Sequence, residues 1–79
     1  MSRYSLFGTS ACHLCEQAQS LLESCQRAGL EFEFVCVDIS ESDLLFERYG
    51  LTIPVLRHPQ GRELLWPFDL AQLQDFLDD

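Results

Sequence analysis

The sequence predicts an α/β fold, with elements in the order β-α-β-α-β-β-α around a mixed four-stranded sheet that has helices on both faces. Three observations lead to this prediction. A helical stretch joins two strand-like runs, which is typical of a parallel strand pair with a helical crossover. Two further strand-like runs flank a turn sequence, and an amphipathic helix follows them. We expect residues 1–79 to form a single domain, because this length is near the lower limit for one hydrophobic core.

The first two predicted elements are a short strand and a helix. Residues 3–8, RYSLFG, alternate in polarity, place Tyr4 and Leu6 on one side and stop at Gly8. Gly29 stands where the following helix ends, because glycine readily adopts the conformation of a helix C-cap. Apolar residues at helical spacing predict the buried face of this helix: Leu14, Ala18, Leu21, Leu22 and Cys25.

The next two elements are predicted to be a buried strand and a short helix. Residues 30–39, LEFEFVCVDI, become apolar on both faces in their second half, which is typical of a strand covered on both sides. We therefore expect Cys36, like Cys25, to lie in the core as a small hydrophobic residue. Residues 40–50 begin with serines that can cap a helix and end at a glycine.

The last three elements are predicted to be a hairpin and a helix. Residues 54–58 and 62–66 are strand-like, and the sequence Pro-Gln-Gly between them is a turn signal. Asp69 is expected to cap a helix over residues 70–79, whose leucines and phenylalanine form one apolar stripe.

Composition excludes several classes of function. A formal net charge of −8 argues against binding to nucleic acid or to an anionic membrane surface. We find no signal peptide and no apolar run near the roughly 18 residues that cross a bilayer, so we expect a cytoplasmic location. Stable disulfides are rare there. The four cysteines are accordingly interpreted as one close pair and two single residues.

The close pair lies in the sequence TSACHLCEQA, at the start of the first predicted helix. A spacing of three brings the sulfurs of Cys12 and Cys15 to the same side of the helix, near enough for a disulfide. Unpaired N–H groups and the helix dipole stabilise a thiolate at this end. We therefore expect a lowered pKa for Cys12, since such surroundings bring cysteine from about 8.5 to roughly 3.5–7.5.

Three interpretations of the pair remain open at this point. A redox pair is favoured by the position between a strand and a helix. Metal binding is less favoured, because tetrahedral zinc usually needs four ligands and the sequence offers no second pair of this kind. We expect no metal. Inert structural cysteines are the third reading. His13 as a cation would favour the Cys12 thiolate, and as an exposed residue it would have no effect.

A second motif, Thr52-Ile53-Pro54-Val55-Leu56, places a proline before an apolar strand. Together with Cys12-His13-Leu14-Cys15 and Pro67-Phe68-Asp69, it makes the whole chain resemble the thioredoxin-like superfamily. The resemblance is strongest to the glutaredoxin-like family of short bacterial proteins. It implies a three-layer sandwich, with a cis Pro54 that faces the two cysteines.

The resemblance also implies roles for individual residues. Cys12 is the expected nucleophile and Cys15 the resolving thiol of a redox disulfide. Ile53, Pro54, His13 and Leu14 are the expected substrate-binding residues, with Ile53 offering backbone hydrogen bonds to an extended substrate.

We therefore predict a small thiol–disulfide oxidoreductase. The alternative is a non-catalytic binding or assembly module, or a metal or iron–sulfur carrier that uses Cys12. The expected partner is a disulfide-containing protein or a small thiol, together with a reductant that the sequence does not identify. We expect a monomer and no cofactor. Glutathione is not assumed, because the lysine before the motif and the glycine pair near the last helix of glutaredoxins are both missing.

Overall fold

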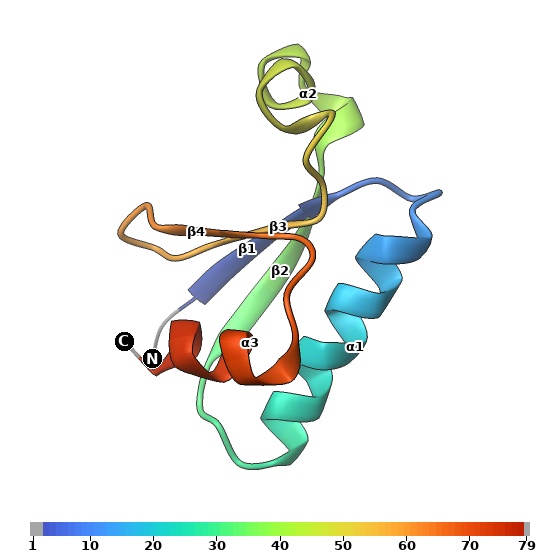
Figure 1. Ribbon diagram of the computed structural model, residues 1–79. Helices are drawn as coiled ribbons and strands as arrows, with labels where there is room; N and C mark the ends of the chain where they lie inside the picture. Colours follow the sequence, from blue (N-terminus) through green and yellow to red (C-terminus); the bar gives the residue numbers. More distant parts are fainter. Residues whose placement is uncertain (1–2, 79) are drawn as a thin grey trace.

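The chain folds in the predicted order of strands and helices (Figure 1). The structure is a computed structural model that describes residues 3–78. Residues 1 and 2 of the expected domain, and Asp79 of the expected last helix, lie outside the described residues. The elements are β1 (Arg3–Gly8), α1 (His13–Arg27), β2 (Glu33–Asp38), a 3-10 turn (Ile39–Glu41), α2 (Asp43–Tyr49), β3 (Val55–Arg57), β4 (Glu63–Leu65) and α3 (Leu70–Leu77).

The four strands form one mixed sheet in the order β2-β1-β3-β4. β1 pairs in parallel with β2 and antiparallel with β3, and β3 pairs antiparallel with β4. In the register, Leu6 lies opposite Cys36 on β2, and Phe7 lies opposite Val55 on β3. The helical crossover therefore joins the parallel pair, and the hairpin adds the other two strands.

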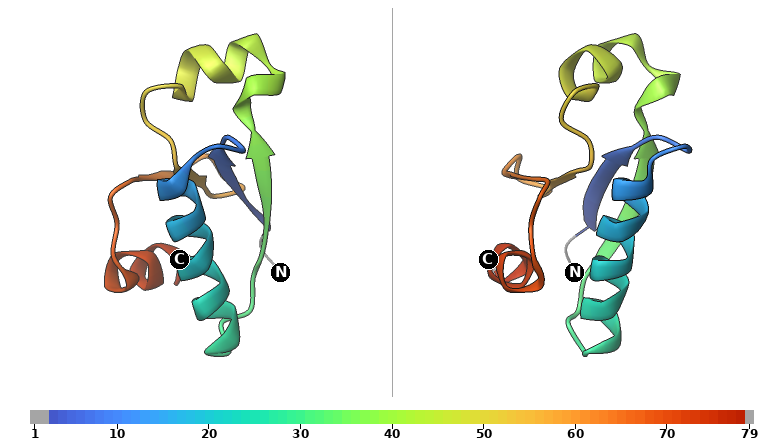
Figure 2. Two further views of the ribbon diagram at one scale, coloured as in Figure 1. Left: turned by 90° about the vertical axis from the view of Figure 1, so that its right-hand side faces the viewer. Right: turned by 45° about the vertical axis from the view of Figure 1, so that its right-hand side comes forward.

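Helices cover both faces of this sheet, as the sequence predicts (Figure 2). Alternation along β1 sends Tyr4 and Leu6 to the face covered by α1 and α3, and sends Phe7 to the face covered by α2. The larger core has the residues Tyr4, Leu6, Ala18, Leu22, Cys25, Phe32, Leu56, Phe68 and Leu73. The smaller core has Phe7, Ile39, Tyr49 and Val55.

Local hydrogen bonds define the ends of the helices. After α1, the Leu30 N–H donates to the Cys25 carbonyl at 3.1 Å, and Gly29 has a φ of 100°, which glycine adopts without strain. At the start of α3, the Asp69 carboxylate accepts from the Gln72 N–H at 2.8 Å, and the Gln72 side chain accepts from the Asp69 N–H at 2.9 Å. This reciprocal pair is a capping box that fixes where the last helix begins.

Two predictions about burial are wrong. Cys36 is exposed rather than in the core, because β2 is an edge strand of the sheet and is not covered on both sides. Leu14 is 45% exposed rather than part of the buried face of α1. It lies in the first turn of α1, next to Cys15, whose sulfur contacts Gly8 at the end of β1.

The stretch 40–50 is not a single helix. A 3-10 turn comes first, and α2 begins after it with Ser42 as its N-cap, whose hydroxyl accepts from the Leu45 N–H at 3.3 Å. Within residues 3–78, no helix is long and apolar enough to cross a membrane.

Candidate active site

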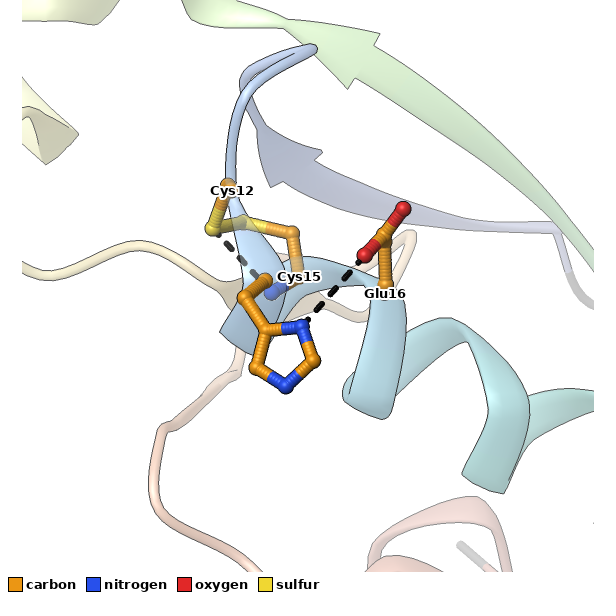
Figure 3. Close-up of a disulfide and its surroundings, with 4 residues drawn as sticks. Cys12, Cys15 and Glu16 are labelled. Carbon is orange, nitrogen blue, oxygen red and sulfur yellow. Dashed lines mark hydrogen bonds and ion pairs between the residues drawn. A yellow bond between two sulfur atoms is a disulfide. The ribbon is translucent and has the colours of Figure 1, made fainter.

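Cys12 and Cys15 form a disulfide at the N-terminus of α1 (Figure 3). Their Cα atoms lie 5.2 Å apart. Cys12 is the N-cap: its backbone is extended, with φ −124° and ψ 104°, and its sulfur accepts from the Cys15 N–H at 3.1 Å. A sulfur in this position receives the N–H groups and the positive end of the helix dipole, which stabilise a thiolate when the disulfide is reduced.

The two sulfurs have different surroundings. Cys12 is half-buried, whereas Cys15 is 8% exposed. The Cys15 sulfur lies against Gly8, where a Cβ atom would stand 2.8 Å from it. No side chain larger than hydrogen fits at residue 8 without moving the sulfur. The pair therefore has one accessible sulfur and one that is held against β1.

His13 and Leu14, the residues between the cysteines, point into solvent. The His13 side chain is 82% exposed, and its Nδ1 lies 3.6 Å from the Glu16 carboxylate. A contact between two side chains as exposed as these is screened by water and contributes little. Leu14 offers an exposed apolar surface next to the disulfide.

Ile53 and Pro54 reach the same region from another part of the chain. The Ile53–Pro54 peptide bond is cis, as is the Trp66–Pro67 bond. Pro54 directly precedes Val55, which lies opposite Phe7, and Phe7 is followed by Gly8, the residue that the Cys15 sulfur contacts. The proline motif and the cysteine motif therefore lie at the same end of the β1–β3 pair.

Tyr49 holds the loop that carries Ile53 and Pro54. Its carbonyl accepts three hydrogen bonds from this loop: from the Thr52 N–H at 2.9 Å, the Ile53 N–H at 3.1 Å and the Thr52 hydroxyl at 3.3 Å. Because the Ile53 N–H is already engaged, the backbone group that Ile53 can offer to a substrate is its carbonyl oxygen.

The Tyr49 side chain is itself anchored to β1 and β4. Its hydroxyl donates to the Glu63 carboxylate, and its ring stacks on Phe7 with centroids 4.5 Å apart. Arg48 lies 3.9 Å from the same carboxylate. Burial, and secondarily the Glu63 carboxylate, raise the pKa of Tyr49 above its ordinary 10.0. Sequence reasoning missed this anchor, for which the only signal was an aromatic residue just before the glycine that ends a helix.

The third motif has a structural role. Asp69 caps α3, and the Trp66 ring meets the Phe68 ring edge-on at 5.0 Å while packing against the larger core. Within residues 3–78, no group of three or more His, Cys, Asp or Glu side chains is placed to hold a metal ion.

Residues 3–78 match the family model of the glutaredoxin-like domain (DUF836). The chain belongs to this glutaredoxin-like family. The X-ray structure of Northeast Structural Genomics target protein XcR50 from X. campestris is 44% identical, with a TM-score of 0.79 over 95% of each chain. The solution structure of the same target is 45% identical, with a TM-score of 0.81 over 99% of this chain and 94% of that one. No curated protein matches the chain.

More distant structures share the fold of this glutaredoxin-like domain. Protein Ne2328 from Nitrosomonas europaea is 24% identical and has a TM-score of 0.75, covering 95% of this chain and 89% of its own. At that identity the likeness shows the fold alone. The fold is thioredoxin-like, in agreement with the resemblance that the sequence motifs indicate.

Proposed function

We propose that this glutaredoxin-like domain is a thiol–disulfide oxidoreductase in which Cys12 is the nucleophile and Cys15 the resolving thiol. One observation carries the proposal: the disulfide stands at a helix N-terminus, with an accessible sulfur at the N-cap and a buried sulfur one turn later. Accessibility and thiolate stabilisation are the two properties that an attacking thiol needs.

The exchange proceeds in two steps. The Cys12 thiolate attacks one sulfur of a substrate disulfide, so that the substrate S–S bond breaks, a Cys12 mixed disulfide forms and one substrate thiolate leaves. Cys15, after losing its proton to water, attacks the Cys12 sulfur and releases the second substrate thiolate. The substrate gains two electrons, and the domain ends with the observed Cys12–Cys15 disulfide.

The surroundings of the disulfide support substrate roles for four residues. Ile53 can offer its carbonyl to an extended substrate, and Pro54 directly precedes β3, at the end of that strand that pairs near Gly8 of β1. His13 and Leu14 present a polar and an apolar side chain on the exposed turn between the cysteines. The chemistry needs no bound cofactor, because the electrons come from the two thiols. A cytoplasmic reductant would return the disulfide to the dithiol.

The proposal is tested by measuring how fast the domain reduces 2-hydroxyethyl disulfide and insulin when a dithiol is supplied to reduce the domain again. We expect Cys12→Ser to abolish turnover, and Cys15→Ser to trap the substrate as a mixed disulfide on Cys12, visible by mass spectrometry. The reduced wild type should be alkylated at Cys12 faster than a free thiol at pH 7.

Cys25→Ala is the matched control, since it removes a cysteine from the same helix away from the disulfide and should leave turnover intact. Two results would count against the proposal. The first is reductase activity that survives in Cys12→Ser. The second is stoichiometric zinc or iron in protein purified under reducing conditions and absent from Cys12→Ser, which would favour a metal carrier.

A further inference from the structure

A cavity of about 350 Å³ lies beside the disulfide, between α1, the loop after β1 and β2. Cys12 and Cys15 line it. Ile53 and Pro54 do not, because they precede β3, the neighbour of β1 on its other side. This β2-side cavity and the loop that carries Ile53 and Pro54 therefore lie on opposite sides of β1.

The β2-side cavity combines apolar walls with sulfur. Leu6 supplies apolar atoms from the sheet, whereas the Val37 side chain packs against the smaller core on the other face. The Gly8 backbone comes close because no side chain separates it from Cys15. Cys36 brings a third sulfur into the wall, since it lies opposite Leu6 on the exposed edge strand. A volume of this size is at the small end of the range for ligand pockets, which suits a small molecule.

Charge in the β2-side cavity is of one sign. Glu16 and Asp38 line it, and none of the five arginines, all of which are within residues 3–78, does so. The Asp38 carboxylate accepts from the Ser40 N–H at 2.9 Å and from the Ser40 hydroxyl at 2.7 Å. These hydrogen bonds lower the pKa of Asp38, so its carboxylate is ionised at neutral pH and held in a fixed position.

We propose that the β2-side cavity binds the half of a small disulfide substrate that becomes joined to Cys12, and that it selects a short thiol bearing an ammonium group over an anionic thiol. The inference rests on the function proposed above and adds a substrate class to it. The short alkyl arm lies along the apolar wall, and the ammonium group faces the carboxylates. An anionic thiol such as a glutamyl peptide is repelled by those carboxylates, and no arginine lines the cavity to attract it.

Occupancy of the cavity can be measured without turnover. In the oxidised protein Cys36 is the exposed free thiol, since Cys25 is buried. Three thioethers that cannot exchange serve as probes: 2-(methylthio)ethylamine is cationic, 2-(methylthio)ethanol neutral and S-methylglutathione anionic. We expect the cationic probe to slow iodoacetamide alkylation of Cys36 by about 3- to 10-fold at low salt, and the anionic probe to have no such effect.

Variants of the carboxylates locate the effect. Asp38→Asn keeps an acceptor for Ser40 but removes the charge, and Glu16→Gln removes the other charge. We expect each to weaken protection by the cationic probe and the double variant to abolish it. Glu47→Gln, on the exposed surface of α2 and outside the cavity lining, is the matched control and should keep full protection. Equal protection by all three probes, or the strongest protection by the anion, would overturn the inference.

Turnover separates this inference from the proposed function. Rates with cystamine and with glutathione disulfide are each divided by the rate with neutral 2-hydroxyethyl disulfide in the same variant. The inference predicts that the cystamine ratio exceeds the glutathione ratio, and that the difference shrinks in 0.5 M salt as the charges are screened. If no disulfide is reduced, the proposed function fails while the alkylation result still stands. If all are reduced without charge preference, only the selectivity fails.

Discussion

Gly8 and Cys15 are in direct contact: a Cβ atom on residue 8 would lie 2.8 Å from the Cys15 sulfur and 3.1 Å from its Cβ. The last residue of β1 thus sets how closely the buried sulfur can approach the sheet. In the dithiol, Cys15 can rotate away from an added methyl group. In the disulfide, its sulfur is bonded to Cys12 and cannot. An added methyl group therefore disfavours the oxidised form more than the reduced form.

The first prediction follows from this contact. Gly8→Ala should raise the reduction potential of the Cys12–Cys15 couple, because overpacking of about 1–2 kcal/mol that falls mainly on the disulfide corresponds to roughly 20–45 mV. The potential is measured by equilibrating the protein in redox buffers and quantifying the free thiols.

Gly61→Ala is the control for this prediction. Gly61 has a φ of 105°, so alanine there is strained, and it lies in the turn between β3 and β4 rather than beside the sulfurs. It should lower the free energy of unfolding and leave the potential unchanged. A shift of equal size in both variants would show that the effect of Gly8→Ala is a general loss of stability.

Neither this contact nor the exposure of Cys36 could be predicted from the sequence, and for the same reason. The order of elements and the position of Cys12 and Cys15 follow from local patterns: alternation, helical spacing and a capping site. Burial in a sheet depends on which strands become edges. The apolar residues 34–37 are consistent with a central strand, but the hairpin joins the other side of β1 and leaves β2 at the edge.

The Tyr49 anchor was missed for a related reason. The C-terminal end of a short helix is predictable from Gly50, but the partner of the tyrosine hydroxyl, Glu63, is 14 residues away on another strand. Only the folded hairpin brings the two together. The proline motif was recognised because it is contiguous, whereas the residues that hold it are not.

The second prediction concerns this anchor. Tyr49→Phe keeps the ring stacked on Phe7 but removes the hydroxyl, so that the half-buried Glu63 carboxylate loses a hydrogen bond. We expect the free energy of unfolding to fall by about 1.5–3 kcal/mol, as is usual for a hydrogen bond to a charged group. Because the Tyr49 carbonyl holds Thr52 and Ile53, KM for an insulin substrate should also rise, with little change in the alkylation rate of Cys12.

Glu63→Gln tests whether the hydrogen bond or the charge matters. The amide oxygen can still accept from the Tyr49 hydroxyl, so this variant should keep a KM close to that of the wild type. If Tyr49→Phe lowers the free energy of unfolding in urea but leaves the KM for insulin unchanged, the Tyr49 hydroxyl stabilises the fold without positioning the loop that carries Ile53 and Pro54.

The third prediction concerns alkaline pH. Burial in the core raises the pKa of the Cys25 thiol above its ordinary 9.0. Above pH 9 the unfolded chain loses this proton while the folded protein retains it, so the free energy of unfolding falls as the pH rises toward the higher, folded-state pKa. One proton gives a slope of at most about 1.4 kcal/mol per pH unit.

The measurement compares urea unfolding of the oxidised wild type and of Cys25→Ala between pH 8 and pH 10.5. Cys12 and Cys15 do not titrate in the disulfide, and Cys36 and the tyrosines are common to both proteins. The wild type should lose more stability over this range than the variant does. Parallel pH curves would mean that the Cys25 thiol ionises equally well in the folded and unfolded chains.

The fourth prediction concerns Leu14, whose exposure beside the disulfide is the clearest departure from the expected pattern of α1. An apolar side chain that is 45% exposed on the turn between two cysteines offers a contact to a protein substrate. Leu14→Ser should therefore raise KM for insulin by about 3- to 10-fold, as expected when a contact of roughly 1 kcal/mol is lost. The rate with 2-hydroxyethyl disulfide, which is too small to span this turn, should change less.

Leu44→Ser provides the matched comparison. Leu44 is 74% exposed on α2, so the substitution makes the same chemical change away from the disulfide. It should leave the KM for insulin and the rate with 2-hydroxyethyl disulfide unchanged. An equal rise of the insulin KM in the two variants would assign the effect to general surface hydrophobicity. A rise confined to Leu14→Ser makes the turn between the cysteines part of the surface that recognises protein disulfides.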